Sequence, residues 1–274
     1  MSGLRFTLVT PVLNGEAFIG STLESVARQS HPHWRYLIMD GGSTDGTLRI
    51  AREFAEGDER VSLVSATDDG MYDAVFRGFD LDDGEVCGWI NADDLLFPWT
   101  LSVVGDAIDA GHRWVTGCDA FWDDQGRLMH VDVPPLYPQS LIRRGWFSGK
   151  GLGWIQQEGT FFTRELLELL TVEQKEEIRG MKLAGDFGLW KAFAEHTPLE
   201  VLSTVTGGFR MHGSNMSRLA LAGYYEEIRQ LGGRSAPSLI RSVYRLIAGI
   251  GGGLRQRRAH AAFMSSRMSD GRDT

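Results

Sequence analysis

Two apolar runs that end on acidic residues constrain this chain more than any other feature. The first, Leu37-Ile38-Met39, ends on Asp40 and leads into Gly41-Gly42-Ser43-Thr44-Asp45-Gly46-Thr47. The second, Gly88-Trp89-Ile90, leads through Asn91-Ala92 to Asp93-Asp94. Runs of this kind are typical of buried strands, and the small residues that follow the first one predict a turn into a helix. Two strand ends that deliver carboxylates to one sheet edge predict a site for a divalent cation and a nucleotide.

The first 111 residues alternate between strand-like and helix-like segments. Strands are predicted over 6–12, 35–40, 61–65 and 86–91, and helices over 16–29 and 71–81. Two further helices are predicted, one that follows an N-cap at Ser43 or Thr44 and one that starts at Pro98. This alternation predicts an α/β fold with a mainly parallel sheet and helices on both faces. Ligands of such sheets bind beyond the carboxyl ends of the strands, where Asp40, Asp69 and Asp93 fall.

The second half of the chain has a different pattern. Segments 114–123 and 128–133 predict a hairpin, and 148–153 forms a glycine-rich loop before a strand-like stretch at 159–164. A helix is predicted over 186–195, strands over 199–205 and 208–211, and a mainly helical tail from Ala220. After Ala236 this tail is basic and carries an apolar stripe: Leu239, Val243, Leu246, Ile247, Ile250 and Leu254.

Composition excludes several classes of protein. The 274 residues, 42% of them hydrophobic, can bury the core of one large domain or of a domain with an appendage. The net charge of −8 argues against nucleic acid as a partner, and two cysteines are too few for a disulfide framework. No run of about 18 apolar residues and no signal-like segment is found, so we expect a cytoplasmic protein.

Seven motifs in order resemble those of the inverting family-2 glycosyltransferases of the GT-A fold. The resemblance covers roughly residues 6–217. Its pieces are Val9-Thr10-Pro11-Val12-Leu13-Asn14, Met39-Asp40 with the segment to Thr47, Asp69-Gly70-Met71-Tyr72-Asp73-Ala74, Gly88 to Asp94, Gln157-Glu158-Gly159-Thr160-Phe161-Phe162, Gly185-Asp186-Phe187-Gly188-Leu189-Trp190 and Phe209-Arg210-Met211-His212-Gly213-Ser214.

The resemblance implies a division of the chain. A GT-A domain would span 1–218, with a Rossmann-like nucleotide-sugar-binding half at 1–111 and an acceptor and catalytic-base half at 112–218. Residues 219–274 would form a helical, basic C-terminal tail. The implied reaction moves a sugar from a nucleotide-diphosphate sugar to a hydroxyl acceptor with inversion, in bacterial cell-surface polysaccharide or glycolipid synthesis.

The resemblance also assigns roles to residues. Nucleotide-sugar binding would involve Thr10, Pro11, Asn14, Asp40, Asp69, Tyr72, Asn91 and Asp93, with a UDP-sugar as the favoured donor. The metal ligands would be Asp93, Asp94 and His212, and they would hold Mn²⁺ or Mg²⁺. Asp186 would be the general base, and Trp146 and Trp154 would contact a saccharide or lipid-linked saccharide acceptor.

Three positions lack an acid that relatives often carry. Gly41 follows Asp40 at a position where the family often has a second acid. Asn91 occupies the position where many members carry the first acid of the metal motif, and Gly185 occupies the position before Asp186 where many members carry glutamate. These departures leave open a catalytically silent nucleotide-sugar-binding module of the same fold.

Simpler interpretations of the site residues and of the tail also stay open. The pair Asp93-Asp94 can cap a helix over 95–104, and Asp186 can cap the helix that follows it. The tail can lie on the anionic inner face of the cell membrane, pack on the catalytic domain, or join two copies into a homo-oligomer.

Other nucleotide-binding folds are disfavoured, because residues 10–15 lack Gly-x-Gly-x-x-Gly and Gly149-Lys150-Gly151 lacks the serine or threonine of a phosphate loop.

Overall fold

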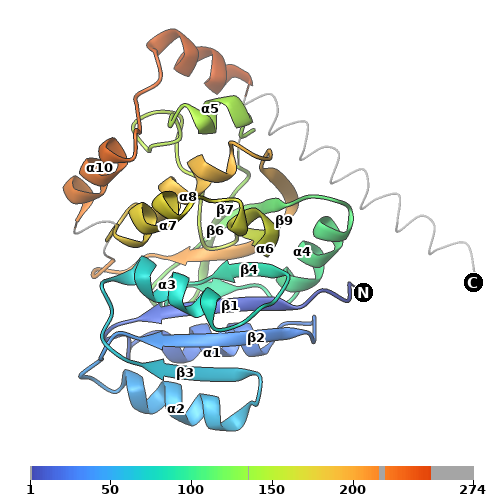
Figure 1. Cartoon of the computed structure of the whole chain (residues 1–274), viewed down its shortest axis with the longest axis vertical. Coiled ribbons are helices and arrows are strands. Elements are labelled where there is room, and N and C mark those ends of the chain that lie inside the picture. The colour runs from blue at the N-terminus through green and yellow to red at the C-terminus, as the bar shows by residue number, and fades with distance from the viewer. Residues whose placement is uncertain (1, 135, 216–219, 248–274) are drawn as a thin grey trace, which may run out of the picture.

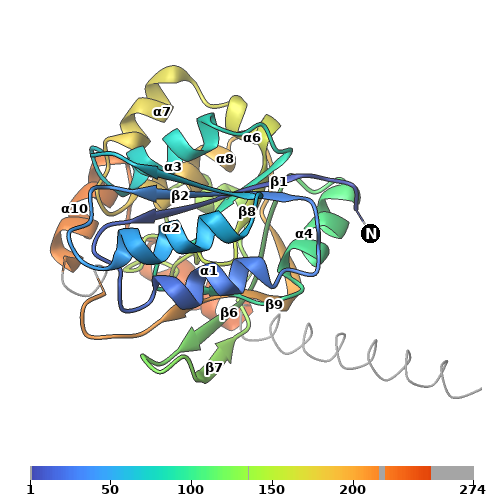
Figure 2. The same ribbon diagram turned by 90° about the horizontal axis from the view of Figure 1, so that it is seen from below.

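The computed structural model describes residues 2–134, 136–215 and 220–247. The amino-terminal half is the predicted parallel sheet, with strands β1 (Phe6–Val12), β2 (Trp34–Asp40), β3 (Val61–Ser65) and β4 (Val86–Trp89) in the order β3-β2-β1-β4. Helices α1 (Ile19–Ala27) and α2 (Thr47–Gly57) cover one face and α3 (Met71–Asp80) covers the other (Figure 2). This confirms the predicted fold class.

The second half extends the same sheet (Figure 1). The path continues as β4-β8-β6-β9-β5, with β8 (Phe161–Thr163) antiparallel to both β4 and β6. Strand β6 (Trp114–Trp122) is parallel to β9 (Glu200–Arg210), and β7 (Leu128–Asp132) forms the predicted hairpin with β6. Among the described residues, this half contains the helices α5 (Gln139–Arg143), α6 (Arg164–Glu168), α7 (Val172–Arg179), α8 (Gly185–Phe193) and α10 (Leu221–Gln230), and a helical segment at 238–247.

Alternating strand residues divide the core between the two faces of the sheet. On one face, Phe6, Leu8 and Ile38 pack against α1 and its neighbours. On the other face, the ring of Trp190 in α8 stacks on Trp89 and Trp114, with ring centroids 5.5 Å apart in each pair. This aromatic packing fixes α8 against β4 and β6, so the first turn of α8 is held at a defined place beside the sheet.

Four sequence predictions are corrected by the structure. Leu95–Leu96 forms the short strand β5, antiparallel to Gly207 and Gly208, so the helix predicted over 95–104 is wrong at its start. Helix α4 is instead Thr100–Asp109, beginning two residues after Pro98. The segments 199–205 and 208–211 belong to one strand, β9. Helix α2 begins at Thr47 with Gly46 as its N-cap residue, so neither Ser43 nor Thr44 caps it.

The start of the predicted tail is helical. It contains α10 and a further helical segment at 238–247, and the rest of the apolar stripe, Ile250 and Leu254, lies outside the described residues. Within residues 2–134, 136–215 and 220–247, no helix has both the length and the apolar character needed to cross a bilayer.

Candidate active site

The carboxyl ends of β1 and β2 are tied together by the first predicted nucleotide-binding residues. Asp40, 1% exposed, accepts hydrogen bonds from the backbone N–H groups of Gly42 and Ser43 and from Ser65 Oγ. Asn14 Oδ1 accepts from the Thr44 N–H at 2.8 Å. These bonds fix the shape of the loop at 41–46, so the edge of the sheet is organised before any ligand arrives.

Two other residues of this group are buried in the sheet. The Thr10 hydroxyl donates to the Ile90 carbonyl at 2.8 Å and lies 2.7 Å from Tyr36 Oη, and Pro11 is buried beside it. The hydroxyl of Thr10 is therefore used inside the protein. Asp69, in contrast, is exposed just before α3.

The space next to Gly41 is taken by another acid. A Cβ atom built on Gly41 would lie 2.7 Å from Asp68 Oδ2, closer than real Cβ contacts allow. Asp68 therefore brings a carboxylate to the place where a side chain at position 41 would begin. The sequence prediction did not include Asp68.

Asp93 and His212 come together although they are 119 positions apart in the sequence. Asp93 Oδ2 lies 2.9 Å from His212 Nε2, and Asn215 Nδ2 lies 2.9 Å from the same nitrogen. The side chain of His212 is 8% exposed and that of Asp93 is 29% exposed. The ring of Phe18 packs on the imidazole with centroids 4.4 Å apart, so the histidine is held in one orientation facing Asp93.

Asp94 is placed differently from its neighbour. It is fully buried, its Oδ1 accepts the backbone N–H of Arg210 at 2.8 Å, and its Oδ2 accepts from Asn91 Nδ2 at 3.2 Å. Burial, followed by the charges of Asp93 and Glu158, raises the pKa of Asp94 well above its ordinary value. Asp94 thus links the end of β4 to β9, and it does not cap a helix, because the N-cap residue of α4 is Trp99.

The three predicted metal ligands do not gather into one cluster. In the part of the chain that the structure describes, no group of three or more His, Cys, Asp or Glu side chains is arranged to hold a metal ion. Asp93 and His212 are paired, while the Asp94 carboxylate is occupied by Arg210 and Asn91. Asn91 Oδ1 is buried without a hydrogen-bond partner among the described residues.

Asp186 lies in the first turn of α8 between two tyrosines. Tyr72 Oη is 3.2 Å from Asp186 Oδ1, and Tyr224 Oη is 3.3 Å from the same oxygen. Burial raises the pKa of Asp186 to about 6, while the N–H of Phe187 and the two hydroxyls act in the opposite direction. The N-cap residue of α8 is Ala184, so the interpretation of Asp186 as a helix cap is wrong.

Gly185 explains how Tyr72 reaches this carboxylate. A Cβ atom at position 185 would lie 2.5 Å from the ring of Tyr72. Glycine at position 185 therefore makes room for the tyrosine, whose hydroxyl meets Asp186.

Helix α10 completes the surroundings of Asp186. Glu227 accepts the backbone N–H groups of Lys182, Leu183 and Ala184 at 2.8–3.0 Å, which holds the segment before α8. Tyr224, one turn earlier on the same helix, supplies the second hydroxyl. From the sequence, α10 was predicted only as part of the tail, and Tyr224 was not among the predicted site residues.

The two predicted acceptor-binding tryptophans have different surroundings. Trp154 is 38% exposed, and its ring contacts the ring of Tyr224, with centroids 5.1 Å apart. Because Tyr224 also contacts Asp186, only this tyrosine separates Trp154 from the carboxylate. Trp146 is half-buried and packs against the core cluster that contains Trp89 and Trp190, and the guanidinium of Arg144 lies over its ring. Trp154 is therefore the better placed of the two for contact with a ligand.

Comparisons with known proteins agree with this geometry. The sequence profile of the family described as "Glycosyl transferase family 2" matches residues 7–154. A Mycobacterium bovis protein named "PGL/p-HBAD biosynthesis glycosyltransferase" is 41% identical over 98 residues, which cover 35% of this chain and 38% of that protein. The chain thus spans less than half the length of the curated relatives it matches.

Two solved structures share the fold. S. aureus TarS 1-349 in complex with UDP-GlcNAc has a TM-score of 0.63 at 19% identity, covering 83% of this chain and 65% of that one. The mannosyltransferase PcManGT from Pyrobaculum calidifontis, in complex with GDP-Man and Mn²⁺, has a TM-score of 0.54 at 17% identity, covering 97% of this chain and 75% of that one. The fold is that of the GT-A glycosyltransferases, and by the match over more than half of its length the chain belongs to glycosyl transferase family 2.

Proposed function

We propose that this protein transfers a sugar from a nucleotide-diphosphate donor to a hydroxyl acceptor with inversion, in the assembly of bacterial cell-surface polysaccharide or glycolipid. The observation that carries the proposal is the position of Asp186. Its carboxylate lies in the first turn of α8 within reach of Tyr72 and Tyr224, and its pKa of about 6 leaves it deprotonated at neutral pH.

Asp186 acts as the general base in this proposal. A sugar hydroxyl is a weak nucleophile until its proton is accepted in the transition state, and a positioned base contributes roughly 10²–10⁴-fold to the rate. With a single base opposite the leaving group, the hydroxyl oxygen bonds to the anomeric carbon as the bond to the phosphate oxygen breaks. The proton passes to Asp186, and the configuration at that carbon inverts.

Asp93 and His212 would hold the divalent cation. Carboxylate oxygen and imidazole nitrogen are donors that Mn²⁺ accepts, and the remaining positions suit phosphate and water oxygens. Such a cation, when bound, neutralises the charge that develops on the departing diphosphate. Mg²⁺ is the alternative ion, and Asp94 acts by fixing the strand end beside Asp93.

The donor site is proposed at the edge formed by Asn14, Asp40, Asp69 and Asn91. A UDP-sugar is our first choice, because a neighbour of the same fold was solved with UDP-GlcNAc. The GDP-Man complex of the second neighbour makes a GDP-sugar the alternative.

The acceptor, a saccharide or a lipid-linked saccharide, is proposed to approach Asp186 past Trp154. A lipid-linked acceptor would be reached at the inner face of the cell membrane. The helical segment 238–247 supports such a contact, because it turns large apolar side chains to the solvent: Leu239, Val243, Leu246 and Ile247.

A catalytically silent binding module is the competing proposal, and one assay separates the two. The purified protein is incubated with MnCl₂, a panel of UDP- and GDP-sugars and simple glycoside acceptors, and the released nucleoside diphosphate is measured. We expect release with one donor and its loss in the variant Asp186→Asn. Binding of a donor in a parallel calorimetric titration, without any release by the wild type, would favour the silent module.

A further inference from the structure

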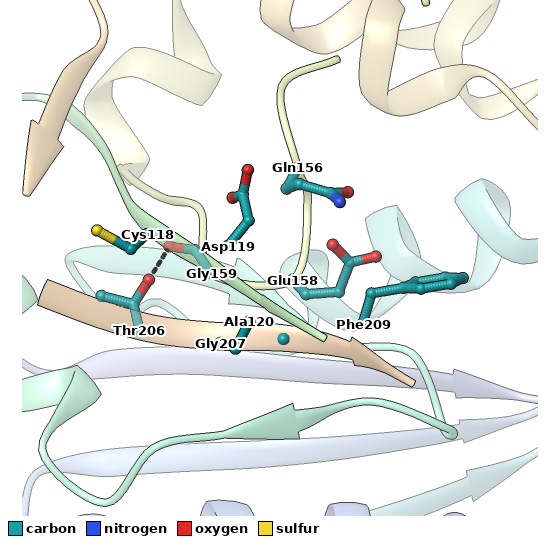
Figure 3. Close-up of a pocket in the computed structure, with 10 residues that line it drawn as sticks. Cys118, Asp119, Ala120, Gln156, Glu158, Gly159, Thr206, Gly207 and Phe209 are labelled. Atoms are coloured by element: carbon teal, nitrogen blue, oxygen red, sulfur yellow. Dashed lines mark hydrogen bonds between the residues drawn. The ribbon is translucent and has the colours of Figure 1, made fainter. Parts of the chain in front are cut away.

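Three acids of the second half that have no role in the proposed transfer step differ in their surroundings. Asp119 and Glu158 line a space beside β9 (Figure 3). This space does not admit a water molecule, so neither carboxylate meets a ligand there. Glu227 of α10 is placed differently, because its carboxylate is hydrogen-bonded to the backbone just before Asp186.

Both carboxylate oxygens of Glu227 bind backbone N–H groups. Oε1 accepts the N–H of Lys182 at 3.0 Å, and Oε2 accepts the N–H groups of Leu183 and Ala184 at 2.9 and 2.8 Å. Hydrogen bonds to an ionised acceptor are roughly twice as strong as those between neutral groups. Ala184, the N-cap residue of α8, makes no side-chain cap hydrogen bond, so the start of this helix is fixed by a carboxylate 43 positions away.

Helix α10 holds the proposed base at two points. Asp186 follows Ala184 by two residues, so a shift of the backbone that Glu227 binds would move the Asp186 carboxylate with it. Tyr224, three residues before Glu227 and on the same side of α10, places its hydroxyl 3.3 Å from Asp186 Oδ1. One helix therefore contacts both the carboxylate of the base and the backbone that carries it.

The docking of α10 does not depend on Glu227 alone. Ala184 and Phe187, at the start of α8, form a buried apolar cluster with Ile228 and Leu231 of α10. This cluster keeps the two helices in contact when the carboxylate is removed. We therefore expect a change at Glu227 to loosen the first turn of α8 without unfolding the protein.

We propose that Glu227 is a positioning residue, which fixes the backbone before α8 and so holds Asp186 where it accepts the proton of the acceptor hydroxyl. A general base works only within about 2.6–3.2 Å of the proton donor, and a displacement of about 1 Å can lower a rate roughly 10²-fold. Glu227 acts through Asp186 and contacts no reacting atom. This inference rests on the proposed function.

The test measures the rate of transfer and the affinity for the donor in the same proteins. The variants are Glu227→Ala, Glu227→Gln and the control Glu226→Ala, each made in the wild type and in Asp186→Asn. Glu226 is the neighbouring glutamate on α10, and its exposed carboxylate binds the side chain of Arg229. For each protein we measure kcat for release of the nucleoside diphosphate in MnCl₂, the donor dissociation constant by calorimetry, and the melting temperature.

We expect Glu227→Ala to lower kcat about 10–100-fold with the donor affinity unchanged. Glu227→Gln should have an intermediate rate, since its amide oxygen can still accept the N–H groups of Leu183 and Ala184. The control should match the wild type. In Asp186→Asn, Glu227→Ala should lower the residual rate no further, because a positioning residue acts only through the base that it holds.

Three results would overturn the inference alone: a wild-type rate in Glu227→Ala, a donor affinity that falls together with the rate, or the same fold loss in the Asp186→Asn background. Glu227→Gln is used for the same comparisons if Glu227→Ala lacks a cooperative melting transition. Failure of the wild type to release nucleoside diphosphate from any donor would overturn the proposed function as well.

Discussion

Asp93 and His212 are separated by 119 positions in sequence, yet Asp93 Oδ2 lies 2.9 Å from His212 Nε2. The contact joins the loop after β4 to the segment after β9, and Asn215 and Phe18 hold the imidazole in place. It brings one carboxylate and one imidazole to the proposed diphosphate site, while the adjacent Asp94 faces the protein interior.

Removal of either partner should weaken nucleotide binding only when the metal is present. We expect Asp93→Asn and His212→Ala to lower the affinity for UDP at least 10-fold in MnCl₂, and to leave the weak metal-free binding unchanged. Calorimetric titrations with and without MnCl₂ measure this. Asp109→Asn, a change at the exposed end of α4, is the control and should match the wild type. Equal losses in the two buffers would contradict the assignment of these residues to the cation.

The pH dependence of transfer should report the surroundings of Asp186. The base works when deprotonated, so kcat/KM should rise with pH through the Asp186 pKa of about 6. The Tyr224 hydroxyl lowers this pKa, so Tyr224→Phe should move the rising limb to higher pH. Tyr225→Phe is the matched control, since Tyr225 stacks on Trp154 and has no hydrogen bond to Asp186. A profile that is the same in all three proteins would exclude Asp186 as the titrating base.

Asp119 should make the ligand-free protein less stable as the pH rises. Burial, with the charges of Glu158 and Asp132, raises the pKa of Asp119 to about 8, so the folded state retains a proton that the unfolded chain releases near pH 4. The contribution of Asp119 to the free energy of unfolding is fully present below about pH 4 and is lost as the pH rises towards 8. Urea unfolding between pH 5 and 8 should show a smaller loss of stability for Asp119→Asn than for the wild type. The exposed hairpin variant Asp124→Asn should follow the wild type, and identical slopes for Asp119→Asn and wild type would refute the prediction.

The helical segment 238–247 should contribute to membrane binding. Its inner side is anchored by the buried Tyr244, while Leu239 and Leu246 are 72% and 67% exposed. The double variant Leu239→Gln/Leu246→Gln should reduce co-sedimentation with phosphatidylglycerol vesicles by several-fold without loss of thermal stability. The control Leu128→Gln/Met129→Gln removes comparable apolar side chains from β7, which lies elsewhere on the surface. Equal co-sedimentation of wild type and the tail variant would count against the membrane contact.

The elements that the sequence predicted correctly carry local signals, and those that it misassigned depend on distant partners. The period and length of the runs at 6–12, 61–65 and 71–81 are enough to identify β1, β3 and α3. The pair Leu95–Leu96, in contrast, is a strand only because Gly207 and Gly208 lie opposite it. In the same way, Ser43 is an apparent helix cap whose hydroxyl instead accepts the N–H of Asn14.

The same distinction holds for the site. The motifs placed Asp40, Asp93 and Asp186 at strand and helix ends, because those positions are local properties of the chain. Tyr224 has no local signal, since its role depends on α10 packing against the start of α8.

The division of roles between Asp186 and Asp93 is the central claim, and paired measurements of transfer and donor binding test it most directly. For Asp186→Asn, the account predicts a loss of transfer of roughly 10²–10⁴-fold with donor affinity in MnCl₂ unchanged. For Asp93→Ala, it predicts that transfer and donor affinity are lost together. Transfer at the wild-type rate by Asp186→Asn, or the same loss of donor affinity in both variants, would contradict it.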